Sequence, residues 1–283
     1  MQHTHTGILL VSFGTSIQHA KLTTIDAIKH RIQTEFPSFP IYEAWTSDFL
    51  RRKAKEQEGI SIPNPSEALR QMLLDGIRTV IIQPTFVIPG AEYRQMRSDA
   101  LALAEDFLSV TIGTPLLACP EDASEAAEAI ANNANDTFPC TDHDMIVFMG
   151  HGASLADSPA LSDSYSMNPE LNPNVLYDLV DTELKAFGYS NMFLKCMNSD
   201  RAVQEILECA HKQNPAEIIL APFMLTAGRH ALKDMAGDHE DSWASKLKAA
   251  GFQVRCIFKG LGEYEAIQSM FVDRIHQSIH SLE

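Results

Sequence analysis

Short apolar runs alternate with longer amphipathic stretches along the chain. The nearly uninterrupted apolar runs are typical of parallel strands that are buried on both faces. They predict strands at Gly7–Phe13, Ile41–Ala44, Thr79–Pro84, Ser109–Ile112, Met145–Met149, Met192–Met197, Glu217–Ala221 and Gln253–Phe258. The amphipathic stretches predict helices at Leu22–Phe36, Pro65–Gly76, Tyr93–Phe107, Glu121–Asn132, Asn174–Phe187, Asp200–Gln213 and Asp241–Ala250. This alternation predicts an α/β fold with parallel sheets covered by helices.

An internal repeat divides the chain into two similar halves. The segment that begins at Ile8 resembles the segment that begins at Ile146, and the segment at Val80 resembles the one at Ile218, so both pairs share a shift of 138 residues. The stretch between residues 131 and 144 is rich in Asn, Asp, Thr and Pro, as linkers are. We therefore expect an N-terminal α/β domain at 1–135 and a C-terminal α/β domain at 140–283.

Histidines follow two predicted strands of the second half. His151 comes after Met145–Met149, and His230 occupies the position that matches Glu92 in the first half. Ligands of open parallel sheets bind beyond the carboxyl ends of the strands, and neutral imidazoles bind borderline divalent metals. Both histidines are therefore candidate metal ligands, although a single histidine is more often a surface residue. Glu92 could equally be an ordinary carboxylate in the first turn of a helix.

Glycines in the same loops leave two interpretations open. Phe13-Gly14-Thr15-Ser16 and Gly150-His151-Gly152 could be simple turns between a strand and a helix. They could also present backbone N–H groups to a carboxylate.

Composition and charge exclude several classes of function. Of the 283 residues, 22 are Lys or Arg and 37 are Asp or Glu, which gives a formal net charge of −15. Such a chain repels phosphate backbones, so nucleic-acid binding is not expected. The sequence contains neither a phosphate-binding G-x-x-x-x-G-K-[ST] motif nor a G-x-G-x-x-G motif after the first strand. The start shows no signal-peptide pattern, and the five scattered cysteines form no C-x-x-C pair, so we expect a cytoplasmic protein with reduced thiols.

Ordered sequence blocks along nearly the whole chain resemble the anaerobic cobalt chelatases, which are sirohydrochlorin cobaltochelatases of the class II chelatase family. These blocks are Leu10–Ser16, Gly90 with Glu92-Tyr93, Val147–Ser154, Ala227-Gly228, His230-Ala231, Asp234–Ala236, Asp241–Trp243, Gly260–Glu263 and Met270–Val272. The resemblance implies two flavodoxin-like halves with a tetrapyrrole cleft between them. It also implies ATP-independent insertion of a divalent metal, Co²⁺ above all, during anaerobic cobalamin synthesis.

The resemblance assigns roles to individual residues. His151 and His230 match the two active-site histidines of the family, and Glu92 matches a carboxylate of the cleft. Asn198 stands where the family usually has a glutamate ligand, and we expect it to be the third metal ligand. Expected contacts with the tetrapyrrole come from Phe13, Gly14, Thr15, Ser16, Gly152, Arg94 and Arg229.

The metal is expected as a substrate, with no tightly bound cofactor. Expected partners are a small tetrapyrrole and a metal ion, with neither nucleic acid nor membrane, and a homo-oligomer is possible. Two alternatives remain open. The chain could be a tetrapyrrole- or haem-binding protein without turnover, or a chelatase for Fe²⁺ or Ni²⁺.

Overall fold

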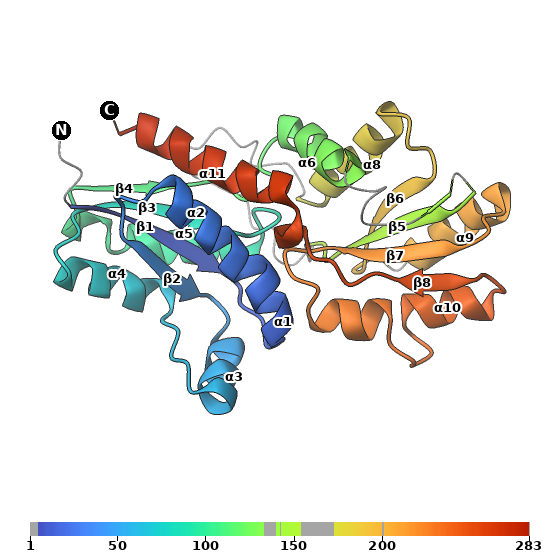
Figure 1. Ribbon diagram of the computed structural model, residues 1–283, viewed down its shortest axis with the longest axis horizontal. Helices are drawn as coiled ribbons and strands as arrows, with labels where there is room; N and C mark the ends of the chain where they lie inside the picture. Colours follow the sequence, from blue (N-terminus) through green and yellow to red (C-terminus); the bar gives the residue numbers. More distant parts are fainter. Residues whose placement is uncertain (1–4, 133–139, 142, 154–172, 200, 283) are drawn as a thin grey trace. The chain divides into compact units, whose positions relative to one another are not determined.

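Two parallel sheets form the framework of the protein (Figure 1). The computed structural model describes residues 5–132, 140–141, 143–153, 173–199 and 201–282. In this part of the chain the sheets have the orders β2-β1-β3-β4 and β6-β5-β7-β8. The strands are β1 (Thr6–Ser12), β2 (Ile41–Trp45), β3 (Thr79–Pro84), β4 (Ser109–Ile112), β5 (Met145–Gly150), β6 (Met192–Cys196), β7 (Ile218–Phe223) and β8 (Val254–Cys256).

The helices alternate with these strands as the patterning predicted, although the last and longest one, α11, was not among the predicted helices. They are α1 (Gln18–Ala20), α2 (Asp26–Glu35), α3 (Asp48–Glu58), α4 (Pro65–Leu74), α5 (Ala91–Leu101), α6 (Pro120–Asn132), α8 (Asn174–Ala186), α9 (Ala202–Gln213), α10 (Trp243–Ala249) and α11 (Glu265–His280). A π-helix, η1 (Lys21–Ile25), joins α1 to α2, and a second one, η4 (Ala231–Met235), follows β7. Two short 3-10 helices are η2 (Ala104–Asp106) and η5 (Leu261–Glu263).

The two sheets repeat one topology, which confirms the predicted α/β fold with two similar halves. In each sheet the first strand in sequence pairs with both the second and the third strand. All pairs are parallel, and β5 and β7 are buried along their full length. Helices must therefore cover both faces, because a parallel sheet carries apolar side chains on each side.

The chain folds into two compact units whose boundary departs from the predicted one. One unit comprises Met1–Leu116 with Glu265–Glu283, and the other comprises Leu117–Tyr264. The repeat pattern predicted that everything after residue 140 belongs to the C-terminal domain, whereas α11 packs against α2 and β3 of the first unit. It also predicted α6 in the N-terminal domain, whereas α6 packs against α8 of the second unit. Most of the expected linker, 133–139 and 142, lies outside the described residues.

A buried arginine fastens α11 to the first unit. Arg274 is 5% exposed, and its guanidinium donates to the carbonyl oxygen of Leu116 at 2.6 Å and to Thr114 Oγ1 at 3.1 Å. The apolar side of the same helix buries Ile267, Phe271 and Ile275 completely. These contacts form only after the chain has traversed the whole second unit, so the boundary cannot follow sequence order.

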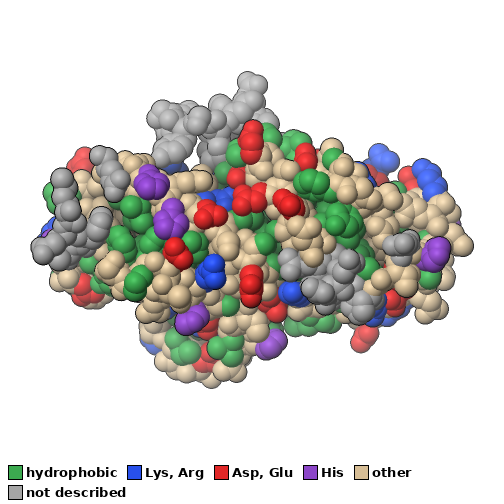
Figure 2. All heavy atoms as spheres, turned by 45° about the horizontal axis from the view of Figure 1, so that its top comes forward, with side chains coloured by type: hydrophobic (Ala, Val, Ile, Leu, Met, Phe, Trp, Pro, Cys, Tyr) green, Lys and Arg blue, Asp and Glu red, His purple; other side chains and the backbone are tan. Residues whose placement is uncertain are grey.

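The surface reflects the composition. On the face shown in Figure 2, acidic side chains are scattered among polar and apolar ones. Among the described residues, no helix combines the length and the apolar content needed to cross a membrane.

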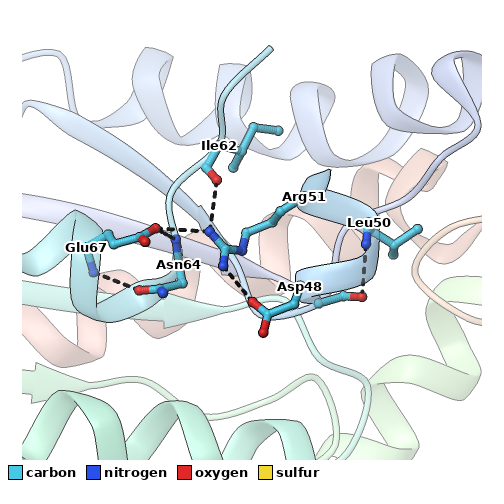
Figure 3. A network of polar contacts seen from close by, with 7 residues as sticks. Asp48, Leu50, Arg51, Ile62, Asn64 and Glu67 are labelled. Carbon is cyan, nitrogen blue, oxygen red and sulfur yellow. Dashed lines mark hydrogen bonds and ion pairs between the residues drawn. The ribbon is translucent and has the colours of Figure 1, made fainter. Parts of the chain in front are cut away.

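A polar network ties α3 to α4 beside the edge strand β2 (Figure 3). Arg51 donates to Asp48 at 2.5 Å and to Glu67 at 3.0 Å. Glu67 also accepts from the backbone N–H of Asn64, whose side chain caps α4 in return. The strongly polar α3 was not among the predicted helices, because it buries only Ala54 and so lacks an apolar stripe.

Candidate metal centre

Three loops meet at the carboxyl edge of the second sheet. The central strand β5 has β6 and β7 as its neighbours, and all three run in the same direction. His151 follows β5, Asn198 follows β6 and His230 follows β7. Because parallel strands end at the same edge, the topology brings these three side chains together in the second unit.

The two imidazoles are neighbours. The ring centroids of His151 and His230 lie 4.9 Å apart, with the ring planes inclined at 76°. His151 is exposed, and the side chain of His230 is 44% exposed. Solvent and a ligand can therefore reach both rings, which excludes the alternative that these histidines fill a closed core.

Hydrogen bonds fix which nitrogen of each ring is free. Nδ1 of His230 lies 2.6 Å from Oδ2 of Asp234, and Nδ1 of His151 lies 2.9 Å from the carbonyl oxygen of Gly152. Both partners accept only, so each Nδ1 carries the proton and donates it. Each Nε2 then keeps its lone pair, which is the form of imidazole that ligates a metal.

A π-helix places Asp234 under His230. His230 caps the N-terminus of η4, and the backbone N–H of Ala236 donates to the carbonyl oxygen of Ala231 at 3.2 Å, five residues back. Residues four apart share one side of a helix, so the carboxylate reaches the ring. No role was predicted for Asp234, although a His-x-x-x-Asp spacing was a usable signal; no helix was predicted over these residues.

Glycines flank His151 because their surroundings leave no room for a side chain. A Cβ atom on Gly150 would lie 2.9 Å from Cε1 of the buried Tyr177. A Cβ atom on Gly152 would overlap the amide of Asn198, and Gly152 has a φ of +75°, a left-handed conformation that favours glycine. Local packing, rather than a general need for flexibility, thus explains the Gly-His-Gly motif.

Two asparagines hold the backbone just after His151. The side chain of Asn198 donates through Nδ2 to the carbonyl oxygen of Ala153 at 2.6 Å. Asn174, at the start of α8, donates to the same oxygen at 2.9 Å and accepts from the backbone N–H of Ala153 at 2.7 Å. No sequence pattern pointed to Asn174, because its contact spans 21 residues and a different element.

Apart from Arg229, the remaining candidates lie at the carboxyl edge of the first sheet, in the other compact unit. The segment Phe13–Ser16 follows β1, and Glu92 lies in the exposed first turn of α5, after β3. Gly14 has a φ of +97°, and a Cβ atom there would lie 2.5 Å from the Trp45 ring. Phe13 is 46% exposed, which leaves an apolar ring available to a ligand.

The two candidate arginines differ in their surroundings. Arg94 donates to the carbonyl oxygen of Pro89 at 3.4 Å within the first unit. Arg229 is exposed beside His230 in the second unit. Arg94 thus lies two residues after Glu92, and Arg229 directly precedes His230.

The donor set for a metal is small. Among the described residues, no group of three or more His, Cys, Asp and Glu side chains is arranged to hold a metal ion. Burial raises the pKa of the Cys196 thiol, at the end of β6, to about 12, which disfavours the thiolate in the metal-free protein. Weak protein ligation suits an ion that must leave again.

Comparisons with known proteins point to one family. The cobalt chelatase (CbiK) family matches residues 6–280. A sirohydrochlorin cobaltochelatase of Salmonella typhimurium is 30% identical over 273 residues, with 96% of each chain covered. The sirohydrochlorin cobaltochelatase CbiKC of Nitratidesulfovibrio vulgaris is 28% identical, with 99% of this chain and 93% of the relative covered.

A solved structure shares the fold. The structure of SirB from Bacillus subtilis with Fe³⁺ matches with a TM-score of 0.67 at 14% identity, covering 98% of this chain and 97% of that one. At this identity the likeness concerns the arrangement of the chain only.

Proposed function

The chain belongs to the cobalt chelatase (CbiK) family, and from this premise we propose that it inserts Co²⁺ into sirohydrochlorin without ATP, in anaerobic cobalamin synthesis. The observation that carries the proposal is the pair of exposed imidazoles, 4.9 Å apart, at the carboxyl edge of the second sheet. Both rings present a lone pair on Nε2, because their Nδ1 atoms are already engaged.

Metal insertion makes two demands on the protein. The incoming ion must lose water, and the tetrapyrrole must lose two N–H protons as its nitrogens bind the metal. We assign the first task to Nε2 of His151 and of His230, which replace water around Co²⁺ and then release the ion to the ring. A freed imidazole can next accept a pyrrole proton at the same Nε2 atom.

The other proposed groups come from both units. Glu92 is assigned as an acceptor of protons and a source of negative charge, which its exposed position in α5 permits. Phe13, Gly14, Thr15 and Ser16, together with Gly152 of the second unit, are assigned to the macrocycle. Arg94 and Arg229 are assigned to its carboxylates, since a guanidinium binds a carboxylate through paired hydrogen bonds. A ligand role for Oδ1 of Asn198 stays a prediction, as does the binding of one tetrapyrrole by both halves.

The proposal extends to the surroundings of the reaction. The metal and the tetrapyrrole are substrates, and we infer no resident cofactor. The net charge of −15 and the scattered acidic side chains of Figure 2 support a protein that does not bind nucleic acid. We assign it to the cytoplasm, where five cysteines stay reduced, and we keep a homo-oligomer as a prediction.

An absorbance assay tests the function directly. Purified protein is mixed with sirohydrochlorin and Co²⁺ without oxygen or ATP, and the spectrum of the metallated ring is followed against a protein-free control. We expect catalytic turnover with Co²⁺, and parallel runs with Fe²⁺ and Ni²⁺ rank the metals. A stoichiometric spectrum of bound, unmetallated ring would instead identify a tetrapyrrole-binding protein.

A further inference from the structure

The side-chain amide of Asn198 is hydrogen-bonded to the backbone that follows His151. Its Nδ2 donates to the carbonyl oxygen of Ala153 at 2.6 Å, the shorter of the two side-chain bonds to that oxygen. The amide also packs directly against Gly152, which has no side chain to push it away. Donation and packing together fix the residues that immediately follow the imidazole.

The chemistry of this contact requires a hydrogen-bond donor, which an amide has and a carboxylate lacks. A carboxylate has only acceptor oxygens, so an Asp or Glu here would place negative charge against the carbonyl of Ala153. Breaking the bond in this way leaves the carbonyl with one donor fewer and adds repulsion. This explains why a neutral Asn stands where the family resemblance leads one to expect a glutamate.

The loop in turn determines the state of His151. Nδ1 of His151 donates to the carbonyl oxygen of Gly152 at 2.9 Å, and Gly152 lies between the ring and the clamped Ala153. A shift of Ala153 therefore moves the carbonyl of the preceding residue, Gly152, which is the acceptor that holds the ring in its metal-binding tautomer. Groups that orient a ligating histidine commonly alter metal affinity 10–100-fold when removed.

We propose that Asn198 is a positioning residue for His151, acting through its hydrogen bond to Ala153 rather than by supplying charge to the metal. The proposal deepens the proposed function, because it takes His151 to be a metal ligand. It assigns Asn174 the same task, through its paired bonds to the N–H and the carbonyl oxygen of the same residue, Ala153.

A single isosteric change separates positioning from ligation. Asn198→Asp keeps the size and one oxygen but removes the N–H donor. If the residue positions His151, Co²⁺ affinity measured without tetrapyrrole falls by about tenfold. If its oxygen ligates the metal, the added charge raises the affinity, and an affinity equal to or above that of the unchanged protein overturns the proposal.

Asn191→Asp is the matched control. Asn191 precedes β6 and donates through Nδ2 to the carbonyl oxygen of Asp144 at 2.9 Å, at the amino edge of the same strand pair. This variant undergoes the same atomic change at a distance from the histidines, so its Co²⁺ affinity should stay within about twofold. Equal losses in both variants would mean a general loss of stability and would also overturn the proposal.

A second readout needs no metal. NMR relaxation of the Ala153 amide should report increased motion in metal-free Asn198→Asp and no change in Asn191→Asp. Unchanged relaxation of the Ala153 amide in Asn198→Asp would contradict the proposal that Asn198 holds Ala153 in place, whatever the tetrapyrrole assay shows. Conversely, the unchanged protein could fail to metallate sirohydrochlorin while Asn198→Asp shows both expected changes. The proposed function would then be wrong, and the positioning role of Asn198 would still hold.

Discussion

The carboxylate of Asp234 accepts the Nδ1–H hydrogen bond of His230 at 2.6 Å, from four residues further along the π-helix η4. The contact fixes the ring tautomer and leaves Nε2 as the basic nitrogen. A carboxylate behind an imidazole also makes the ring a stronger ligand. The helix geometry thus prepares His230 for a metal before any metal arrives.

Replacing Asp234 should weaken metal binding without removing a ligand. In Asp234→Ala, the His230 ring can rotate and adopt either tautomer, so Co²⁺ affinity should fall by about 10- to 100-fold. Titration of Co²⁺ into the protein without tetrapyrrole measures this. Asp241→Asn is the control, since the side chain of Asp241 is 80% exposed and lies near Lys246 in the same unit. A similar loss in both variants would attribute the effect to net charge rather than to the hydrogen bond.

Removing either imidazole should abolish insertion and leave the fold intact. His151→Ala alters an exposed loop residue, and His230→Ala alters a half-exposed residue at the start of η4, so neither removes a core side chain. The rate of cobalt insertion should fall by more than about 100-fold, because losing the partner of a ligating histidine alone costs up to that amount. His211→Ala is matched, since Nδ1 of His211 also lies close to a backbone carbonyl, that of Leu207, at 2.6 Å. Retained insertion in both site variants, with normal circular dichroism, would remove the histidines from the mechanism.

The strands could be predicted because buried parallel strands consist of nearly continuous apolar residues, which the sequence shows directly. Apolar runs such as Thr79–Pro84 and Ser109–Ile112 match β3 and β4 residue for residue. Helix ends were less predictable. The helix expected over Tyr93–Phe107 ends at Leu101 and is followed by the short η2, a change that the spacing of apolar residues does not record.

The part of the site that the strand topology determines could be predicted. Strand ends in a parallel sheet locate His151 and His230 at one edge, and the structure places their rings in contact. The hydrogen bonds of Asn174 and Asn198 to Ala153 could not be predicted, because the two asparagines belong to separate elements. The return of α11 to the first unit is likewise a packing outcome, which depends on Arg274 and not on any local pattern.

Partial burial should make Cys196 slow to react. Removal from water raises the pKa of its thiol to about 12, so at pH 8 only about one molecule in 10⁴ carries the reactive thiolate. Alkylation by iodoacetamide, followed by peptide mass spectrometry, should be more than about 10³-fold slower than for a free cysteine, whose pKa is about 8.5. Because the raised pKa disfavours the charged form, labelling should quicken with each unit of pH up to that value. The urea-unfolded chain is the control, in which all five cysteines should react. Labelling of the folded protein at pH 8 as fast as that of a free cysteine would contradict the raised pKa.

Gly152 and Gly188 allow backbone strain to be separated from crowding at the site. Both have a left-handed backbone, with φ of +75° and +92°, but only Gly152 has a side chain, that of Asn198, where a Cβ atom would lie. Gly188→Ala should therefore lower the free energy of unfolding by about 1–2 kcal/mol through backbone strain alone.

Gly152→Ala should cost more than Gly188→Ala, because it adds the displacement of Asn198. We expect a further loss of about 1–3 kcal/mol in the free energy of unfolding, the usual range for crowding a packed site. Urea titrations of both variants measure the difference. Co²⁺ affinity should fall in Gly152→Ala alone, since only there does the new methyl group disturb the peptide that orients His151. Equal unfolding free energies would show that the Asn198 amide moves aside without cost, and an unchanged Co²⁺ affinity would show that this peptide does not control the ring.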